Sequence, residues 1–302
     1  MIASLFDPIL PIFAIMAVGY WLRKRGIFSV EHARAINRFV FFVATPLLLF
    51  SILSRASVDA IDLVALGIYL LAELVLYAAV TILLNRVFKR DLAESVLLGM
   101  SAVFVNHVFF VLPIAERLYG SVATQPIASI ILIDAVVLFC GTVLLIDYLK
   151  SDRGSAIATV LSFFKNPFLL SSLIGIAASG FQEIIPSGIF TFANFVGGSA
   201  APASLFALGV VLASSRIQSI GFTTWFVVSA KILIHPALFF GLSAVVTAAT
   251  LTNNPMLLVA AGPCGAMPFV IALQYEIKTD AIAKAMLIST LLSLISLAAL
   301  TA

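Results

Sequence analysis

The chain has 302 residues, of which 62% are hydrophobic and only 10% charged, and its formal net charge is +3. Soluble domains are about half apolar and about a quarter charged, so this composition excludes a water-soluble globular protein. The basic residues are spread over short loops between apolar stretches, a distribution that excludes a nucleic-acid-binding surface.

The apolar residues form ten stretches of about 20 residues, the length at which a helix crosses a bilayer. In chain order these predicted spans centre near Met16, Ala44, Val75, Asn106, Val136, Ile174, Leu205, Leu238, Ala266 and Leu292. Strands of a membrane barrel would instead be about 10 residues long with alternating polarity. The sequence therefore predicts an all-α membrane protein with ten transmembrane helices. The first lacks the basic segment of a signal peptide and is expected to be retained.

The loop charges predict how these helices are oriented. One face would receive Arg23, Lys24, Arg25, Arg34, Arg38, Arg86, Lys89, Arg90, Lys150, Arg153, Lys165, Arg216, Lys278 and Lys284. The other face would receive only Arg55 and Arg117. Because basic loops face the cytoplasm, we expect a multi-pass protein of the plasma (inner) membrane with both termini extracytoplasmic.

Weak internal similarity indicates two repeats, residues 1–150 and 166–302, at an offset of about 155–160 residues. Pro46-Leu-Leu-Leu-Phe50 matches Pro202-Ala-Ser-Leu-Phe206, and Ile127-Ala128 matches Ile282-Ala283. Five helices per repeat is an odd number, so the second repeat would enter the membrane from the opposite side. Inverted repeats of this kind are typical of secondary transporters.

Spans four and nine, at equivalent places in the two repeats, are the least helix-like. Proline removes a helical hydrogen bond, so Pro113, Pro263 and Pro268 are expected to break or open these helices near the middle of the membrane. Opened backbone in a bilayer must face a cavity or ligand, and half-helix N-termini attract anions. The predicted substrate-binding residues are Asn106, His107, Pro113, Gly265, Met267 and Pro268.

Five ionisable residues lie inside predicted spans, where each is costly unless it is paired or hydrated: Glu73, His107, Asp134, Lys231 and His235. Glu73 and Lys231 occupy near-equivalent positions in the repeats, so we hypothesise a buried ion pair, either structural or involved in coupling. Asp134 could bind Na⁺ together with Ser289 and Thr290, or carry a proton. No other metal site is expected, and the only cofactor-like ion would be Na⁺ or H⁺.

The sequence resembles the auxin efflux carrier family over nearly its whole length. The resemblance rests on Asn106 followed by Leu112-Pro113-Ile114 and Leu118-Tyr119-Gly120, on Pro268, on Gln274-Tyr275-Glu276 and on Ser289-Thr290 with Ser293. Within that family the sequence resembles a bacterial-type member related to malonate and malate permeases and to plant auxin carriers. Two departures are His107, where many relatives have a small or polar residue, and the missing long central loop of plant carriers.

This resemblance implies a fold like that of sodium/proton antiporters and bile acid symporters, with crossing helices four and nine. It also implies a homodimeric elevator. Spans one, two, six and seven (about 5–54 and 166–214) would form the scaffold and dimer surface. Spans three to five and eight to ten (about 62–150 and 222–301) would form the transport domain.

The sequence favours a secondary transporter of a small organic anion, a mono- or dicarboxylate, whose partners are that anion, the lipid bilayer and a second copy of the chain. A bile acid type sodium symporter or a cation/proton antiporter is the alternative within transport. A membrane enzyme would need a catalytic motif, and we find none. A receptor on the same fold would bind its ligand without moving it.

Overall fold

A computed structural model describes residues 2–55, 62–150, 167–214, 220–247 and 255–300. Its N-terminal half contains α1 (Ile2–Lys24), α2 (Val30–Phe39), η1 (Val40–Ala44), α3 (Thr45–Leu53), α4 (Leu63–Ile82), η3 (Leu83–Val87), α5 (Leu92–Ser101), η4 (His107–Val111), α6 (Leu112–Tyr119), η5 (Gly120–Ala123), α7 (Thr124–Ile133), η6 (Asp134–Phe139) and α8 (Cys140–Lys150). Its C-terminal half contains α10 (Pro167–Ser179), α11 (Ser187–Gly197), α12 (Ala200–Ser214), α13 (Phe222–Ser229), η7 (Ala230–Ile234), α14 (His235–Thr247), α15 (Pro255–Ala260), α16 (Met267–Gln274) and α17 (Asp280–Leu300).

The expected all-helical architecture is confirmed over the described residues, where the one strand-like feature is an isolated bridge between Val105 and Cys264. Six helical segments within these residues are long and apolar enough to cross a membrane. They are Val30–Leu53, Leu63–Val87, Pro126–Lys150, Ser187–Ser214, Phe222–Val246 and Asp280–Leu297. Shorter apolar helices cover Leu92–Ser101 and Leu170–Ser179. The count of ten spans stays a prediction.

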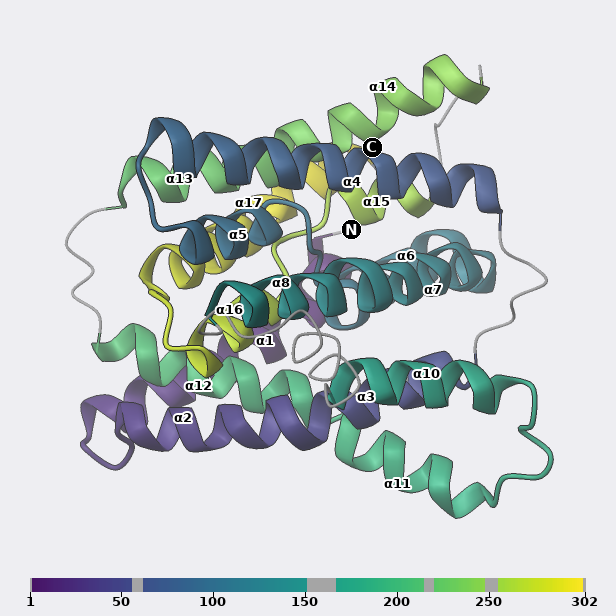
Figure 1. The fold of residues 1–302 in the computed structure, drawn as a ribbon, viewed down its shortest axis with the longest axis horizontal. Helices are drawn as coiled ribbons and strands as arrows, with labels where there is room; N and C mark the ends of the chain where they lie inside the picture. The colour runs from purple at the N-terminus through teal and green to yellow at the C-terminus, as the bar shows by residue number, and fades with distance from the viewer. Residues whose placement is uncertain (1, 56–61, 151–166, 215–219, 248–254, 301–302) are drawn as a thin grey trace.

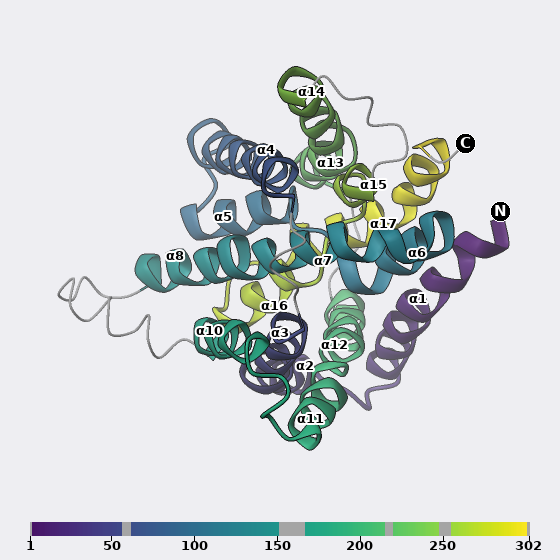
Figure 2. The same ribbon diagram turned by 90° about the vertical axis from the view of Figure 1, so that its right-hand side faces the viewer.

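The helices pack as two groups (Figures 1 and 2). In the outer group, which comprises α1–α3 and α10–α12, α1 runs along α12, and α3 packs against α10 and α11. In the crossing group, which comprises α4–α8 and α13–α17, α4 packs on α5 and α14, and α17 packs on α13 and α5. The two groups meet through α2 and α16, where the buried Asn37 side chain donates a 2.9 Å hydrogen bond to the Val270 carbonyl.

Prolines shape several of the spans without ending them. Three π-helical turns stop two residues before a proline: η1 before Pro46, η4 before Pro113 and η7 before Pro236. A proline ring clashes with the carbonyl four residues earlier and supplies no N–H, and a widened turn accommodates both effects. Pro113, which the sequence predicts to break or open span four, is the second residue of the continuing α6, so it does not end the helix, and the widened turn η4 before it is the opening.

The loops between helices emerge at opposite ends of the molecule. The α1–α2, α4–α5 and α16–α17 turns lie at one end in Figure 1, and the α10–α11 turn lies at the other. The first three carry Arg25, Lys89 and Lys278, and the last carries Glu183. This arrangement agrees with the segregation of charge read from the sequence. Arg153, Lys165 and Arg216, which belong to the same prediction, lie outside the described residues.

Candidate functional site

Two interrupted helices cross at the centre of the crossing group. α5 ends at Ser101 and the helix restarts at His107, while α15 ends at Ala260 and α16 starts at Met267. The two nonhelical stretches between them run antiparallel. The Asn106 N–H donates to the Pro263 carbonyl at 3.0 Å, and the Gly265 N–H donates to the Phe104 carbonyl at 2.9 Å. Each break thus satisfies part of the other's backbone, which an apolar environment requires.

The crossing depends on glycine. A Cβ placed on Gly265 would lie 2.7 Å from the Val105 carbonyl oxygen and 2.7 Å from the Phe104 ring. A Cβ on Gly262 would lie 2.6 Å from Val111 Cγ2. Contacts this short force the chains apart, so any side chain at Gly265 would displace the backbone of the crossing.

Pro263 and Pro268 hold different positions in the second break. Pro263 lies between the half-helices, as the sequence predicts, and its carbonyl accepts the Asn106 N–H. Pro268 instead stands in the first turn of α16, a position where proline is favoured because its missing N–H would be unpaired in any case. It therefore starts a half-helix and does not interrupt one.

A pocket lies between the crossing and the outer group, and its empty space, together with the open solvent at its mouth, is about 690 Å³. Its lining residues are Thr45, Leu48, Leu49, Ile52, Phe104, Val105, Asn106, His107, Ile131, Asp134, Ala135, Phe139, Ala201, Leu205, Gly265, Ala266 and Met267. The pocket is mostly apolar, and its few polar side chains are Thr45, Asn106, His107 and Asp134. Binding sites for small molecules commonly combine an apolar wall with a few polar groups that fix orientation.

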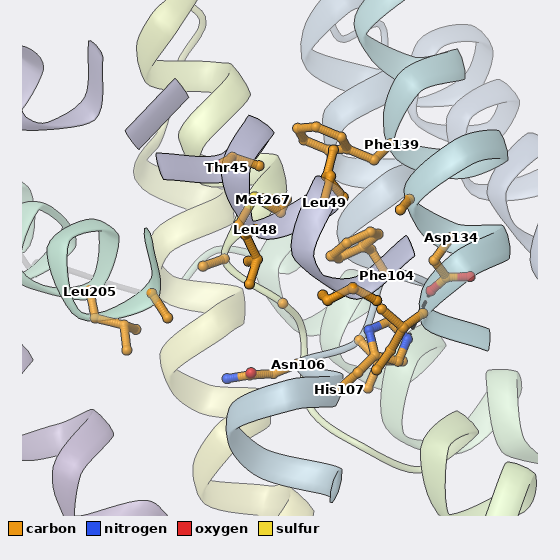
Figure 3. A pocket seen from close by; sticks show the side chains of 17 residues that line it. Thr45, Leu48, Leu49, Phe104, Asn106, His107, Asp134, Phe139, Leu205 and Met267 are labelled. Carbon is orange, nitrogen blue, oxygen red and sulfur yellow. Dashed lines mark ion pairs between the residues drawn. The ribbon is translucent and has the colours of Figure 1, made fainter. Parts of the chain in front are cut away.

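The polar side chains of the pocket lie on two sides (Figure 3). Asn106 extends away from His107 and Asp134, which face each other across a 2.9 Å separation between Nε2 and Oδ2. Both His107 and Asp134 are buried. The distance is that of an ion pair, but the ring nitrogen and the carboxylate are not aligned as a hydrogen bond.

Further charged groups are packed behind this pair. Glu73 on α4 is fully buried, and its carboxyl group lies against that of Asp134. Lys231 on η7 is also fully buried, and its Nζ is 2.9 Å from the Ala260 carbonyl oxygen and 2.8 Å from His235 Nδ1. The hypothesis of a direct Glu73–Lys231 ion pair is wrong for this conformation, because the Lys231 ammonium caps the end of α15 instead. Its charge still acts on both carboxyl groups.

The predicted site residues thus fall into three places. Asn106, His107, Asp134, Gly265 and Met267 come together around the pocket. Glu73 and Lys231 lie behind it, and Pro113 and Pro268 lie in the half-helices beyond the breaks.

Ser289 and Thr290 do not join Asp134 in this conformation. Ser289 Oγ accepts the Cys264 N–H at 3.1 Å and donates to the Met286 carbonyl, and Thr290 Oγ1 donates to that same carbonyl at 2.7 Å. Both hydroxyls are therefore engaged within α17 and at the crossing.

Sequence reasoning missed the wall that the outer group contributes. Thr45 and Leu49 of α3 and Ala201 and Leu205 of α12 line the pocket. These residues flank Pro46 and Pro202, the motif that matches between the two repeats. Thr45 and Ala201, and likewise Leu49 and Leu205, are separated by the same offset in the sequence. The shared motif was the signal that could have identified them.

Comparisons with known proteins agree with a membrane carrier. The profile of the family described as membrane transport protein matches residues 4–158 and 153–301. An uncharacterized transporter of Methanothermobacter thermautotrophicus is 26% identical over 96% of this chain and 95% of its own length. A Rhizobium meliloti protein named "Putative malonate transporter" is 24% identical over 96% of this chain and 93% of its own.

A plant protein is similar over a shorter stretch. Auxin efflux carrier component 7 of Arabidopsis thaliana is 24% identical over 53% of this chain and 25% of its own length. Because the family profile covers almost every residue, the chain belongs to the membrane transport protein family, that of the auxin efflux carriers, and is a transporter and not an enzyme.

Proposed function

We propose that the protein is a secondary active transporter that carries a small organic anion across the plasma membrane by alternating access. The observation that carries this proposal is the crossing of two interrupted helices beside a pocket, with the Asn106 side chain extending from one break and Gly265 in the other. Broken helices at the midpoint of inverted repeats are the usual binding site of secondary transporters.

The topology that we propose has ten spans in two inverted five-helix repeats, with both termini outside the cell. The repeats draw support from the pocket, because Thr45 and Leu49 in one half and Ala201 and Leu205 in the other occupy equivalent places. The antiparallel pairing at the crossing also supports two repeats, because the break in one half donates a backbone hydrogen bond to the break in the other half and accepts one from it.

The chemistry of the pocket favours an anion with an apolar body. The Asn106 amide and the His107 ring can donate hydrogen bonds, and the half-helix that starts at Met267 directs its N-terminus to the pocket. Leucine, isoleucine and phenylalanine side chains cover most of the remaining wall. Organic acids are also what the names of two relatives refer to, malonate in one and auxin in the other.

The arrangement of the two groups supports an elevator mechanism. The pocket has one wall from α3 and α12 of the outer group and its other walls from the crossing group. A rigid movement of the crossing group along this boundary would carry the pocket from one side of the membrane to the other. The outer group would then be the static scaffold and the surface of a homodimer.

One observation favours the alternative of a cation/proton antiporter. The structure places Glu73 against Asp134, so two carboxyl groups meet near the crossing. Paired acids are the arrangement that ion exchange would use. Their neighbour Lys231 and the apolar pocket wall weigh toward the anion carrier.

Uptake by proteoliposomes separates these functions. Purified protein would be reconstituted and tested with labelled malonate, malate and indole acetate under a pH gradient, a Na⁺ gradient or neither. Saturable uptake of an acid, absent from protein-free vesicles, establishes the carrier. Na⁺/H⁺ exchange without uptake of any acid would replace our proposal with the antiporter.

The Asn106→Ala variant is expected to lower uptake of the transported acid by about 10- to 100-fold, because a hydrogen bond to a charged group contributes about 1.5–3 kcal/mol. The measurement is the initial uptake rate at a subsaturating concentration. Asn85→Ala is the matched control, since Asn85 lies in η3, after α4, and its amide donates to the Arg90 carbonyl. Uptake at the wild-type rate in Asn106→Ala would remove Asn106 from the site.

A further inference from the structure

Buried polar atoms that lack a hydrogen-bond partner are concentrated at one place in the described residues. Of eleven such side-chain atoms, seven belong to Tyr69, Glu73, His107, Asp134 and His235. Buried polar groups are normally bonded, so a cluster of exceptions calls for an explanation such as a bound proton, ion or ligand. All five side chains are at least nine-tenths buried.

The centre of this cluster is a pair of carboxyl groups. Glu73 is completely buried and Asp134 nearly so, and the two lie against each other. Neither Glu73 oxygen has a partner in hydrogen-bond geometry. Two ionised carboxylates in contact away from water repel strongly, whereas one proton between them removes the repulsion and supplies the missing donor. Burial of both carboxyl groups and the unpartnered Glu73 oxygens therefore favour one proton shared by the two groups.

A fixed positive charge balances the negative charge that remains. Lys231 Nζ bonds the Ala260 carbonyl, at the C-terminal end of the half-helix α15, and its ammonium acts on both Glu73 and Asp134. A single net negative charge on the pair and a single positive charge on Lys231 leave the cluster neutral. The chain thus already provides the cation that a sodium ion would otherwise supply.

Oxygen ligands for a sodium ion are engaged elsewhere. Hard cations are held by several carboxylate, hydroxyl or carbonyl oxygens. The candidates predicted from the sequence, Ser289 and Thr290, bond the Met286 carbonyl, and Ser289 also accepts from Cys264. On its pocket side Asp134 faces the imidazole of His107. A sodium site would instead place further oxygen ligands there.

Titratable groups face the carboxyl pair from every side of the crossing group that packs on it. They are Tyr69 on α4, His107 on η4 and Lys231 on η7, and beside Lys231 lie His235 on α14 and Cys264 at the crossing. Of these, His107 alone lines the pocket. His107 and Asp134 both line the pocket, and Nε2 stands 2.9 Å from Oδ2, so a rotation that aligns the two groups allows one proton transfer from the carboxyl pair to His107.

We propose that Glu73 and Asp134 hold one proton between them, and that this proton, exchanged with the pocket through His107, is the ion coupled to anion movement. The proton moves between Asp134 Oδ2 and His107 Nε2, and no other bond forms or breaks. An imidazolium at His107 would attract the anion, so proton arrival and anion binding favour each other. The coupling of the proton to anion movement rests on the proposed function, whereas the presence of the shared proton does not.

Infrared spectroscopy tests the shared proton without a substrate. A protonated carboxyl group absorbs in the carbonyl region, apart from ionised carboxylates. The purified wild-type protein at neutral pH should show this band with the small downshift in D₂O expected of a carboxylic acid. The band should vanish in Glu73→Gln. It should persist in Glu94→Gln, which removes another buried glutamate, one that pairs with Arg90 at 3.0 Å. A wild-type spectrum that equals that of Glu73→Gln overturns the proposal.

Double substitution provides a second, independent test of the charge balance. Glu73→Gln or Asp134→Asn alone leaves one carboxylate opposite Lys231, so each should unfold within about 4 °C of wild type. The double variant leaves Lys231 buried without a counter-charge and should unfold more than about 8 °C lower. A clear rise in the unfolding temperature of both single variants would mean that each substitution relieves repulsion between two ionised carboxylates, and would overturn the proposal.

Transport measurements then test the coupling. In wild-type proteoliposomes, an inward proton gradient should raise uptake of the transported acid several-fold over protein-free vesicles, and a Na⁺ gradient should not. In Glu73→Gln the stimulation by the proton gradient should be lost. Stimulation by Na⁺ alone would overturn the coupling while leaving the carrier intact. Failure of every acid, with the infrared band present, would reject the proposed substrate and retain the shared proton.

Discussion

Gly265→Ala is expected to lower uptake by about 100-fold or more. The new Cβ would meet the Val105 carbonyl and the Phe104 ring at 2.7 Å, and the crossing hydrogen bond from Gly265 holds the two chains at that separation. Relieving the contact displaces the half-helices, and a shift of about 1 Å in a binding geometry can cost about 100-fold in rate. The expected loss of transport is measured as the initial uptake rate of the variant relative to that of the wild type.

The matched control is Gly241→Ala on α14, where a Cβ meets no atom within 4 Å. This variant should transport at the wild-type rate. Overpacking at Gly265 should also lower the free energy of unfolding by about 1–3 kcal/mol, which is measured by thermal unfolding in detergent. This measurement distinguishes a protein that fails to fold from a folded protein whose half-helices are displaced. Wild-type uptake in a folded Gly265→Ala protein would show that the tight crossing is not needed for transport.

Lys231→Met should destabilise the protein by on the order of 3–5 kcal/mol, the cost of leaving a buried charge uncompensated. The substitution removes the cation opposite Glu73 and Asp134 and leaves the Ala260 carbonyl without its cap. Adding both Glu73→Gln and Asp134→Asn to Lys231→Met removes the remaining charge and should restore part of the loss. The part that is not restored reflects the Ala260 carbonyl, since a buried acceptor without a partner costs about 1–3 kcal/mol.

Lys278→Met provides the control for the loss of a lysine, because Lys278 is exposed in the α16–α17 turn. Its free energy of unfolding should change by no more than about 0.5 kcal/mol. Thermal or denaturant unfolding in a fixed detergent compares all four proteins. If Lys231→Met proved as stable as Lys278→Met, the ammonium would not be the balancing charge of the cluster.

Several features of the site could be predicted from particular residues. Asn106, Gly265 and the proline at position 263 indicated two interrupted helices, and the structure has both interruptions. The five ionisable residues were recognised individually because each is improbable in an apolar span. Their pairing was not predicted correctly. Repeat symmetry suggested Glu73 with Lys231, whereas the structure places Glu73 against Asp134 and Lys231 against the end of α15.

This pairing could not be predicted because the sequence of a membrane helix does not show which of its faces is buried in the protein. A soluble helix reveals its buried face by the periodicity of its apolar residues, but a span is apolar on the side facing lipid and on the side facing protein. The direction in which Glu73 or Leu205 points is therefore not encoded in a pattern of polarity. The π-helical turns before Pro46, Pro113 and Pro236 add local rotations that shift every later side chain around its helix.

By itself, the sequence determined that this is an α-helical membrane transporter with two broken spans, because composition and proline placement act locally and do not depend on neighbours. The tertiary structure alone decided that α3 and α12 complete the pocket and that Asp134 stands between His107 and Glu73. Contacts between side chains far apart in the chain depend on helix rotation and crossing. Close packing sets both, at glycines such as Gly265 where two backbones can meet.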